Sequence, residues 1–399
     1  MNILYYCDEY PPTRNGGIGT VVKLVAEAMA ARGHQVTVAG RYADTRGKET
    51  VDQINGVTVI RWCKGCYRTF GIRICDLIRD QKRLREVKSQ RILNRTQRLL
   101  ERVIKERRVE LLEMPDYVDL FVNNDGIEYP LRRFPVPMVV RVHGSVSFLY
   151  RHLQGADNEE KTKQDKFFFA KADAICAVSG FSKRYVEENL SPDKDIEVIY
   201  NPIDSGSFEN VIPSAPAQPT ILFFGKIAEM KGAWSLIKAF NLVAEKHPQV
   251  KLRLVGNGDI DKAKRLVDSR FADRVEFAGF VPHERIVHEI DSATCCVLPS
   301  YFENFSMAAL EVLARKRALI YTERASGKEL IDDGENGFLV DPDNVVQIAE
   351  KMELLFSDAS LRHRLAENGY EMCRGRFSTE TIIPQMEQYY QSVIQKCRK

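Results

Sequence analysis

The sequence lacks the features of a secreted or membrane-spanning protein. No apolar run among its 399 residues is long enough to cross a bilayer. The N-terminus turns acidic at Asp8, where a signal peptide would still be apolar. Nine cysteines are scattered without a regular framework, which is typical of a reducing compartment. We therefore expect a cytoplasmic protein.

An excess of charge of one sign is also missing from the chain as a whole. The net charge is +3, and 44% hydrophobic with 28% charged residues is an ordinary soluble composition. A balance this small does not indicate a nucleic-acid partner, and we expect none.

Metal-binding patterns are weak. The one C-x-x-C motif has no fourth ligand at zinc spacing. Two D-x-D pairs occur, Asp259 with Asp261 and Asp341 with Asp343. We predict that these aspartates are N-cap and first-turn residues of helices. The sequence therefore predicts no metal site and no cofactor.

Strand patterns recur in two blocks, with helical patterns in most of the gaps. In the first block they lie at residues 2–6, 36–39, 57–61, 109–113, 138–142, 174–178 and 196–200. In the second block they lie at residues 221–224, 251–255, 275–277 and 294–298. Alternation of this kind indicates a mostly parallel sheet, so we predict an α/β fold with two doubly wound domains.

A segment with three prolines, 205–219, separates the two blocks. We predict an interdomain linker there, between a first domain at 1–204 and a second at 220–378. The helical pattern at 379–396 carries apolar residues on one face. We therefore expect this C-terminal helix to pack back on the first domain.

The most informative stretch runs from the strand at 294–298 into a helix that begins near Phe305. This helix is apolar nearly all round, which indicates burial, yet it carries Glu311. A buried carboxylate is costly unless hydrogen-bond donors meet it, and ligand hydroxyls are one such set. Backbone N–H groups of Phe305, Ser306 and Met307, at the helix start, fit a phosphate. The alternative is that Glu303 favours the helix dipole and Glu311 pairs with a core arginine.

Two lysines follow the first strand of the second block. Gly225 and Lys226 come directly after that strand, and Lys231 and Gly232 stand where the next helix opens. Lysines in loops are usually solvated. We predict a functional role for these two lysines only because an anion site is expected at the helix start described above.

Three further strand ends carry glycine or histidine. Gly16 and Gly17 lie between the first strand and a helix, where open α/β sheets bind anions, although their spacing is not a dinucleotide fingerprint. Gly256 and Asn257 repeat the glycine-rich strand end in the second block. His143 ends another strand, and a lone histidine is more often structural than functional.

Together these residues resemble the retaining GT-B glycosyltransferases of family 4, and the likeness covers essentially the whole chain. The family's G-R-x4-K-G motif, its strand-end histidine and its E-x7-E pair are matched here by Gly225, Lys226, Lys231, Gly232, His143, Glu303 and Glu311. Lys226 replaces the usual arginine, which keeps the positive charge but loses the bidentate fork.

The resemblance implies two Rossmann-like domains that face a central cleft, with a UDP- or GDP-linked sugar bound mostly on the second domain. Glu311 would accept hydrogen bonds from the ribose hydroxyls, and Glu303 would lie near the sugar. Lys226 and Lys231 would hold the pyrophosphate, and His143 would lie near the reacting face of the sugar. The implied catalytic residues are His143, Glu303, Lys226 and Lys231. The implied donor-binding residues are Gly16, Gly17, Gly256, Asn257, Val281, Asn304, Phe305, Ser306, Met307 and Glu311.

The implied activity is a retaining transfer of the sugar to a glycan or lipid-linked acceptor in polysaccharide or glycoconjugate synthesis. It needs no metal ion, because cations around the leaving pyrophosphate lower the barrier. Two alternatives stay open, namely a nucleotide-sugar epimerase of the same fold and a nonenzymatic nucleotide-sugar binding protein. An oxidoreductase is a poor alternative, because neither block carries the dinucleotide fingerprint.

Positive charge is concentrated in one segment, residues 61–108, which holds sixteen Lys or Arg against five Asp or Glu. The segment therefore has a net charge of +11. Much of it has a helical pattern, with apolar residues that form a stripe along one side. A basic helix of this kind is typical of a membrane-surface element. The alternatives are a solvated face or a groove for an acidic acceptor. Our hypothesis is that the first domain docks on the anionic cytoplasmic leaflet, with the stripe mostly facing its own core.

Overall fold

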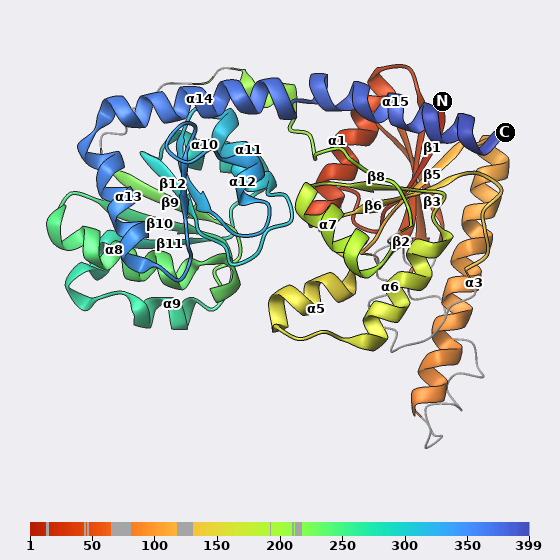
Figure 1. Ribbon diagram of the computed structural model, residues 1–399, viewed down its shortest axis with the longest axis horizontal. Coiled ribbons are helices and arrows are strands. Elements are labelled where there is room, and N and C mark those ends of the chain that lie inside the picture. Colours follow the sequence, from red (N-terminus) through yellow and green to blue (C-terminus); the bar gives the residue numbers. More distant parts are fainter. Residues whose placement is uncertain are drawn as a thin grey trace. The chain divides into compact units, whose positions relative to one another are not determined.

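The computed structural model describes residues 1–12, 16–43, 45, 48–64, 81–117, 131–191, 193–209, 211 and 218–398, and for residues 81–88, 153 and 154 the backbone alone. The chain divides into two units. The first comprises Met1–Pro202 together with Ile382–Lys399, and the second comprises Ile203–Thr381. Each unit has its own sheet of parallel strands with helices around it, so the predicted α/β fold is confirmed (Figure 1).

In the described part of the first unit, eight strands form a sheet in the order β3-β4-β2-β1-β5-β6-β7-β8. Their bounds are β1 Asn2–Tyr6, β2 Gln35–Tyr42, β3 Thr50–Ile54, β4 Val57–Cys63, β5 Leu111–Pro115, β6 Met138–Val142, β7 Ala174–Ala177 and β8 Ile196–Val198. All neighbouring pairs are parallel except β3 with β4. The strand order reverses between β1 and β5, and ligands of open α/β sheets bind at such a reversal, beyond the carboxyl ends of the strands.

Six described helices accompany this sheet in the first unit. Their bounds are α1 Gly17–Ala31, α3 Gln81–Arg107, α5 Val146–Gln154, α6 Glu159–Lys171, α7 Gly180–Asn189 and α15 Thr379–Arg398. Helix α1 buries Val21, Val22, Val25 and Met29, which recur at helical spacing.

The C-terminal helix α15 packs on the first unit from Ile382 onward, at β1 and β5 (Figure 1). The Tyr390 hydroxyl donates to the buried Glu113 carboxylate at 2.5 Å, and the Tyr389 hydroxyl donates to the Ile175 carbonyl at 2.9 Å. Burial raises the pKa of Glu113, while the charge of Arg141 opposes that rise. Residues from β5, β7 and α15 therefore share one buried network.

The described strands of the second unit number six, in the order β11-β10-β9-β12-β13-β14, and all neighbours are parallel. Their bounds are β9 Thr220–Phe224, β10 Lys251–Val255, β11 Val275–Gly279, β12 Cys295–Leu298, β13 Ala318–Thr322 and β14 Phe338–Val340. The accompanying helices are α8 Ala233–Lys246, α9 Ile260–Leu266, α10 His283–Asp291, α11 Met307–Ala314, α12 Gly327–Leu330, α13 Val345–Ser357 and α14 Ala359–Phe377. If the six strands of this sheet are numbered in chain order, their order across the sheet is 3-2-1-4-5-6, as in dinucleotide-binding folds. The strand order reverses between β9 and β12.

Only part of the predicted linker, 205–219, is described, and residues 210 and 212–217 lie outside the described residues. Residues Ser205–Phe208 form a short 3-10 helix. Arg315 in the second unit donates to the carbonyl oxygens of Ser207 and Glu209 at 3.2 and 2.9 Å. This part of the segment therefore packs on the second unit.

The D-x-D pairs have different roles. Asp259 is the N-cap of α9 and accepts from the Lys262 N–H at 3.0 Å, as predicted. The same prediction is wrong for Asp341 and Asp343, because the N-cap of α13 is Asn344 and both aspartates accept from the Arg324 guanidinium. No helix in the described ranges is both long and apolar enough to cross a membrane.

Candidate active site

The loops that follow β9 and β12 meet backbone to backbone in the second unit. A Cβ on Gly232 would lie 2.0 Å from the Pro299 carbonyl oxygen, and one on Gly256 would lie 1.9 Å from the Gly225 carbonyl oxygen. Gly225, Gly232 and Gly256 also have positive φ angles of +131°, +73° and +135°. Glycine is required at Gly232 and Gly256 on both grounds, and at Gly225 because of its φ angle alone, since a Cβ there would meet nothing within 4 Å. The tight approach brings Lys231 beside the loop that carries Glu303.

Lys231 and Glu303 form an ion pair at this point. The Lys231 Nζ donates to the Glu303 Oε1 at 2.6 Å, and the Ser300 hydroxyl donates to the same oxygen at 3.0 Å. Their side chains are 32% and 17% exposed, so both can still reach a ligand. Lys226 is exposed in the same loop region and forms no ion pair with any described residue. Two cations thus lie at the strand-order reversal of the second sheet.

Helix α11 begins at Met307, two residues after the predicted start. Ser306 is extended, with φ −84° and ψ 114°, and its hydroxyl accepts from the Ala309 N–H at 3.2 Å. Serine at this position stabilises a helix start, which explains the shift. The N–H groups of Met307 and Ala308, in the first turn of α11, have no partner within the helix. Asn304, Phe305 and Ser306, which precede the helix in the loop, are buried.

Glu311 lies on the one face of α11 that is only partly buried, and 19% of its side chain is exposed. Ala309, Leu310, Val312 and Leu313 are buried, whereas Met307, Ala308 and Glu311 are partly accessible. No arginine pairs with Glu311, and its described partner is His283, whose Nε2 lies 3.7 Å from the carboxylate. Burial raises the pKa of Glu311 to about 7. The alternative, in which Glu311 pairs with a core arginine, is therefore not seen among the described residues.

The remaining predicted residues of the second unit end neighbouring strands. Gly256 and Asn257 follow β10, and the Asn257 carbonyl accepts from the Ile227 N–H at 2.9 Å. Val281 is half-buried between β11 and α10. Because β9, β10, β11 and β12 are parallel, these residues share one edge of the sheet with Lys226 and Glu303.

In the first unit, Gly16 is the N-cap of α1 and Gly17 is its first residue. The Gly16 N–H donates to the Glu9 carboxylate at 3.2 Å. A Cβ on Gly19 would lie 2.4 Å from the Glu9 carbonyl oxygen, whereas a Cβ on Gly17 would meet nothing within 4 Å. Gly17 therefore borders open space, and Gly19 is needed for close packing.

His143 follows β6, and its backbone N–H donates to the buried Asp116 carboxylate at 2.7 Å. Burial, assisted by the charge of Arg141, lowers the pKa of His143 to about 3, so the imidazole is neutral at pH 7. Its Nε2 is shielded from solvent and has no partner among the described residues. A neutral ring with an unsatisfied nitrogen is suited to exchange a hydrogen bond with a ligand.

Four residues of these loops were not predicted, namely Glu9, Asp116, His283 and Ser300. Asp116 carried a usable signal, since it is a carboxylate placed directly after a buried strand. The others gave none, because their roles depend on which loops the fold brings together.

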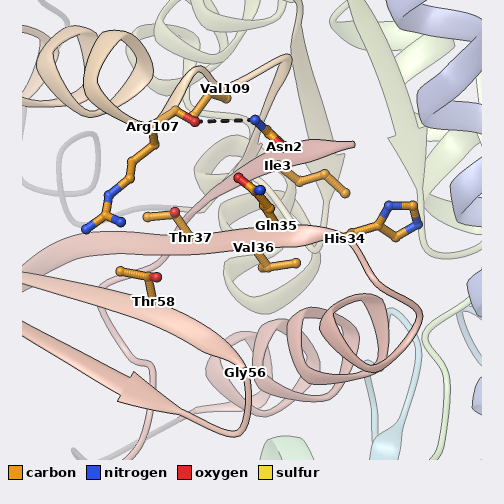
Figure 2. Close-up of a pocket in the computed structure, with 10 residues that line it drawn as sticks. All are labelled: Asn2, Ile3, His34, Gln35, Val36, Thr37, Gly56, Thr58, Arg107 and Val109. Carbon is orange, nitrogen blue, oxygen red and sulfur yellow. Dashed lines mark hydrogen bonds between the residues drawn. The ribbon is translucent and has the colours of Figure 1, made fainter.

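A cavity of about 270 Å³ lies at the opposite edge of the first sheet (Figure 2). Asn2 and Gln35, which begin β1 and β2, line it together with Gly56, which precedes β4. Arg107 borders it and accepts a hydrogen bond from Asn2 through its carbonyl oxygen. The cavity is therefore at the amino ends of the strands and separate from the residues described above.

Two family models match adjacent parts of the chain. The one described as Glycosyltransferase Family 4 matches residues 15–206, and the one described as Glycosyl transferases group 1 matches residues 206–372. Together they cover residues 15–372, which is most of both units.

Individual proteins resemble the chain over nearly its whole length. Glycogen synthase of Mycobacterium tuberculosis is 25% identical over 420 residues, which cover 98% of this chain and 94% of that protein. The structure of sucrose-phosphate synthase from Thermosynechococcus elongatus matches with a TM-score of 0.77 and 20% identity, over 99% of this chain and 100% of the other. HepE of Anabaena, solved in complex with UDP and glucose, matches with a TM-score of 0.71 and 17% identity, over 98% and 100%. These structures establish that the fold is GT-B.

Proposed function

The chain belongs to the group 1 glycosyltransferases, and from this premise we propose that it moves a sugar, with retention of configuration, from a UDP- or GDP-linked donor to a glycan or lipid-linked acceptor. The observation that carries the proposal is Glu311, a largely buried carboxylate, 19% exposed, whose one described partner is His283 at 3.7 Å. Such a group is costly unless a ligand satisfies it, and the hydroxyls of a ribose would do so.

The diphosphate of the donor is assigned to the cations and the start of α11. Lys231 and Lys226 supply positive charge, and the N–H groups of Met307 and Ala308 point along the helix axis. An arriving diphosphate would replace Glu303 as the partner of Lys231. Glu303 would then be released to accept from a sugar hydroxyl.

The chemistry follows from where charge develops. The bond from the anomeric carbon to the diphosphate oxygen breaks, and both electrons leave with the diphosphate. Lysines and helix N–H groups preorganised around that leaving group stabilise it without a metal ion. Attack from the same face retains the configuration, and the leaving phosphate oxygen takes the acceptor's proton. The neutral His143 ring would bind the sugar as acceptor or donor of a hydrogen bond.

The acceptor is proposed to lie at a membrane surface because of the exposed face of α3. Arg91, Arg95, Arg98, Arg102 and Lys105, which we name the basic stripe, are exposed and separated by four, three, four and three positions. That spacing places them on one side of the helix. Of the sixteen basic residues in 61–108, Arg68, Arg73 and Arg79 and the side chains of Lys82, Arg83, Arg85 and Lys88 lie outside the described residues.

The apolar face of α3 is used within the unit. Leu93, Leu100, Val103 and Ile104 are at most 4% exposed. Arg61, at the other end of the basic segment, is buried and paired with Asp52 at 2.6 Å. Contact with a membrane would therefore be electrostatic, worth up to about 1 kcal/mol per basic residue near anionic lipid.

Donor recognition is tested by thermal shift with UDP, GDP and ADP, followed by incubation with the matching nucleotide sugars and an acceptor screen. Stabilisation by one nucleoside diphosphate and transfer to an acceptor support the proposal. Epimerisation without an acceptor would instead identify an epimerase, and tight binding with no turnover would identify a binding protein.

Membrane contact is tested by co-sedimentation with vesicles of anionic and of neutral phospholipid. Binding should require anionic lipid, fall as salt rises, and be lost in the variant Arg91→Glu, Arg95→Glu, Arg98→Glu. A variant with the same change in net charge, Lys163→Glu, Lys166→Glu, Arg184→Glu, alters exposed residues of α6 and α7 and serves as the control. Equal recovery in the supernatant with both lipids at low salt would favour a soluble acidic saccharide as acceptor.

A further inference from the structure

Asp116 occupies the strand-order reversal of the first sheet. It directly follows β5, the neighbour of β1 across that reversal, and it is 1% exposed. Its own N–H donates to the Arg141 carbonyl at 3.0 Å, which fixes its backbone against β6. The carboxylate therefore lies inside the ligand-binding edge of the sheet without reaching solvent.

Both carboxylate oxygens of Asp116 accept from the turn that carries His143. The Oδ1 accepts from the His143 N–H at 2.7 Å, and the Gly144 N–H lies 3.2 Å from Oδ1 and 3.1 Å from Oδ2. Gly144 has a φ of +126°, so the chain leaves the strand conformation there and its N–H cannot join the sheet. Asp116 provides the acceptor that this turn needs.

A second carboxylate holds the far side of the same turn. Asp165 on α6 accepts from the Ser147 N–H at 2.8 Å, and the Tyr185 hydroxyl donates to the Ser147 hydroxyl oxygen at 3.1 Å. Burial raises the pKa of Asp116 to about 8, and the nearby charge of Asp165 adds to that rise. The N–H groups of His143 and Gly144 oppose that rise, so they are the contacts that favour the ionised form of the buried carboxyl group.

We propose that Asp116 is a positioning residue for sugar transfer, which fixes the backbone of His143 and Gly144 so that the His143 imidazole meets the sugar of the donor. This inference rests on the proposed function, because it assigns His143 a contact with the sugar. Asp116 itself touches neither the donor nor the reacting atoms.

The experiment compares three substitutions of Asp116. Asp116→Ala removes the acceptor and leaves a cavity, Asp116→Leu removes it at similar volume, and Asp116→Asn retains one acceptor oxygen in a shape close to the neutral acid. We expect kcat to fall at least tenfold in the Ala and Leu variants. The Asn variant should recover kcat to within threefold of the wild type at pH 7. The Kd of the free nucleoside diphosphate should stay within twofold in all three, since the residues assigned to it lie in the second unit.

A double-mutant cycle with His143→Ala identifies the route of the effect. If Asp116 acts through His143, adding Asp116→Leu to His143→Ala should lower kcat by less than twofold. An equal loss in both backgrounds would overturn the inference. So would a kcat within threefold of the wild type in the Ala or Leu variant, or a matching loss of diphosphate affinity.

Hydrogen exchange of the His143 and Gly144 amides separates this inference from the proposed function. Exchange should speed up at least tenfold in the Ala or Leu variant and stay near the wild-type rate in the Asn variant. Unchanged exchange in both would show that Asp116 does not hold the turn. If the wild type transferred no sugar, the proposed function would fail on that result alone, and the inference would fail with it, because the turn would then position nothing.

Discussion

Each unit holds a carboxylate close to a strand-order reversal, fully buried in the case of Asp116 and largely buried in the case of Glu311, and the two differ in their partners. Burial raises the pKa of Asp116 to about 8 and that of Glu311 to about 7. Asp116 accepts from two backbone N–H groups of its own unit, whereas Glu311 has a single ion-pair partner 3.7 Å away. The raised pKa reports burial in both cases. The supply of hydrogen-bond donors is what separates a carboxylate that holds the fold from one that awaits a ligand.

The largest effect expected from this difference is on stability. Because the pKa of Glu311 is raised from 4.5 to about 7, ionisation of this carboxylate costs folding free energy as pH rises between those two values, and the cost is complete above pH 7. Glu311→Gln should therefore raise the free energy of unfolding at pH 8 by about 2 to 3 kcal/mol and leave it unchanged at pH 4. Urea unfolding at both pH values measures this. A variant that is less stable than the wild type at pH 8 would mean that a protein group satisfies the carboxylate.

The same substitution should act on turnover in the opposite direction. Glu311→Gln and Lys231→Ala are each expected to lower donor turnover at least tenfold, about 1.4 kcal/mol of transition-state stabilisation, because their partners belong to the ligand. Steady-state kinetics with the donor identified by thermal shift provide the measurement. Glu371→Gln changes an exposed glutamate of α14 and is the matched control. Unfolding of Glu311→Gln with normal kinetics in the surviving fraction would contradict the assignment.

A smaller effect is expected at the start of α1, where two glycines differ in their surroundings. Gly17→Ala should raise the free energy of unfolding by about 0.5 to 1 kcal/mol, since its Cβ meets open space, and should lower turnover a few-fold if phosphates approach the backbone there. Gly19→Ala should instead destabilise the fold by about 1 to 3 kcal/mol, because its Cβ would lie 2.4 Å from the Glu9 carbonyl oxygen. Full turnover by Gly17→Ala would remove this glycine from the donor site.

No effect is expected from chelation. Turnover should persist in EDTA, because lysines and helix N–H groups are assigned to the diphosphate. The measurement compares initial rates with EDTA and with added Mg²⁺ or Mn²⁺. Loss in EDTA that either ion restores would overturn the metal-free mechanism.

Local patterns predicted most of the regular structure. Helix α8 begins at Ala233, directly after the Lys231 and Gly232 at which a helix was predicted to open, since its apolar spacing and the glycine before it are local signals. Strand β3 was missed because four of its five residues are exposed and the fifth is half-buried, which leaves no apolar pattern. Strand β13 was also missed. It follows Arg315 and Arg317, whose charges suggest an exposed segment, although both side chains are buried and donate hydrogen bonds to Asp291. Strand β14 has three residues, too few for a pattern.

The residues of the candidate site also differ in whether local sequence patterns could predict them. Lys231 and Glu303 could be predicted because glycines and a helix start mark their loops, and the fold brings them within 2.6 Å. Glu9 could not be predicted, and for Asp116 the sequence marks the position but not the partners, because the N–H groups that both residues accept from are placed nearby only by the folded chain. For Asp116 the two donors are 27 and 28 positions away along the chain.

The C-terminal helix α15 belongs mostly to the first unit, and this affects the order in which the units can be completed. Residues from Ile382 onward complete the first unit, yet ribosomes synthesise them after the whole of the second unit. Until then Glu113 lacks the Tyr390 hydroxyl, and the apolar surface that receives α15 is uncovered. The first unit can therefore be completed only after the whole of the second unit has been synthesised, and until then its uncovered apolar surface is open to aggregation.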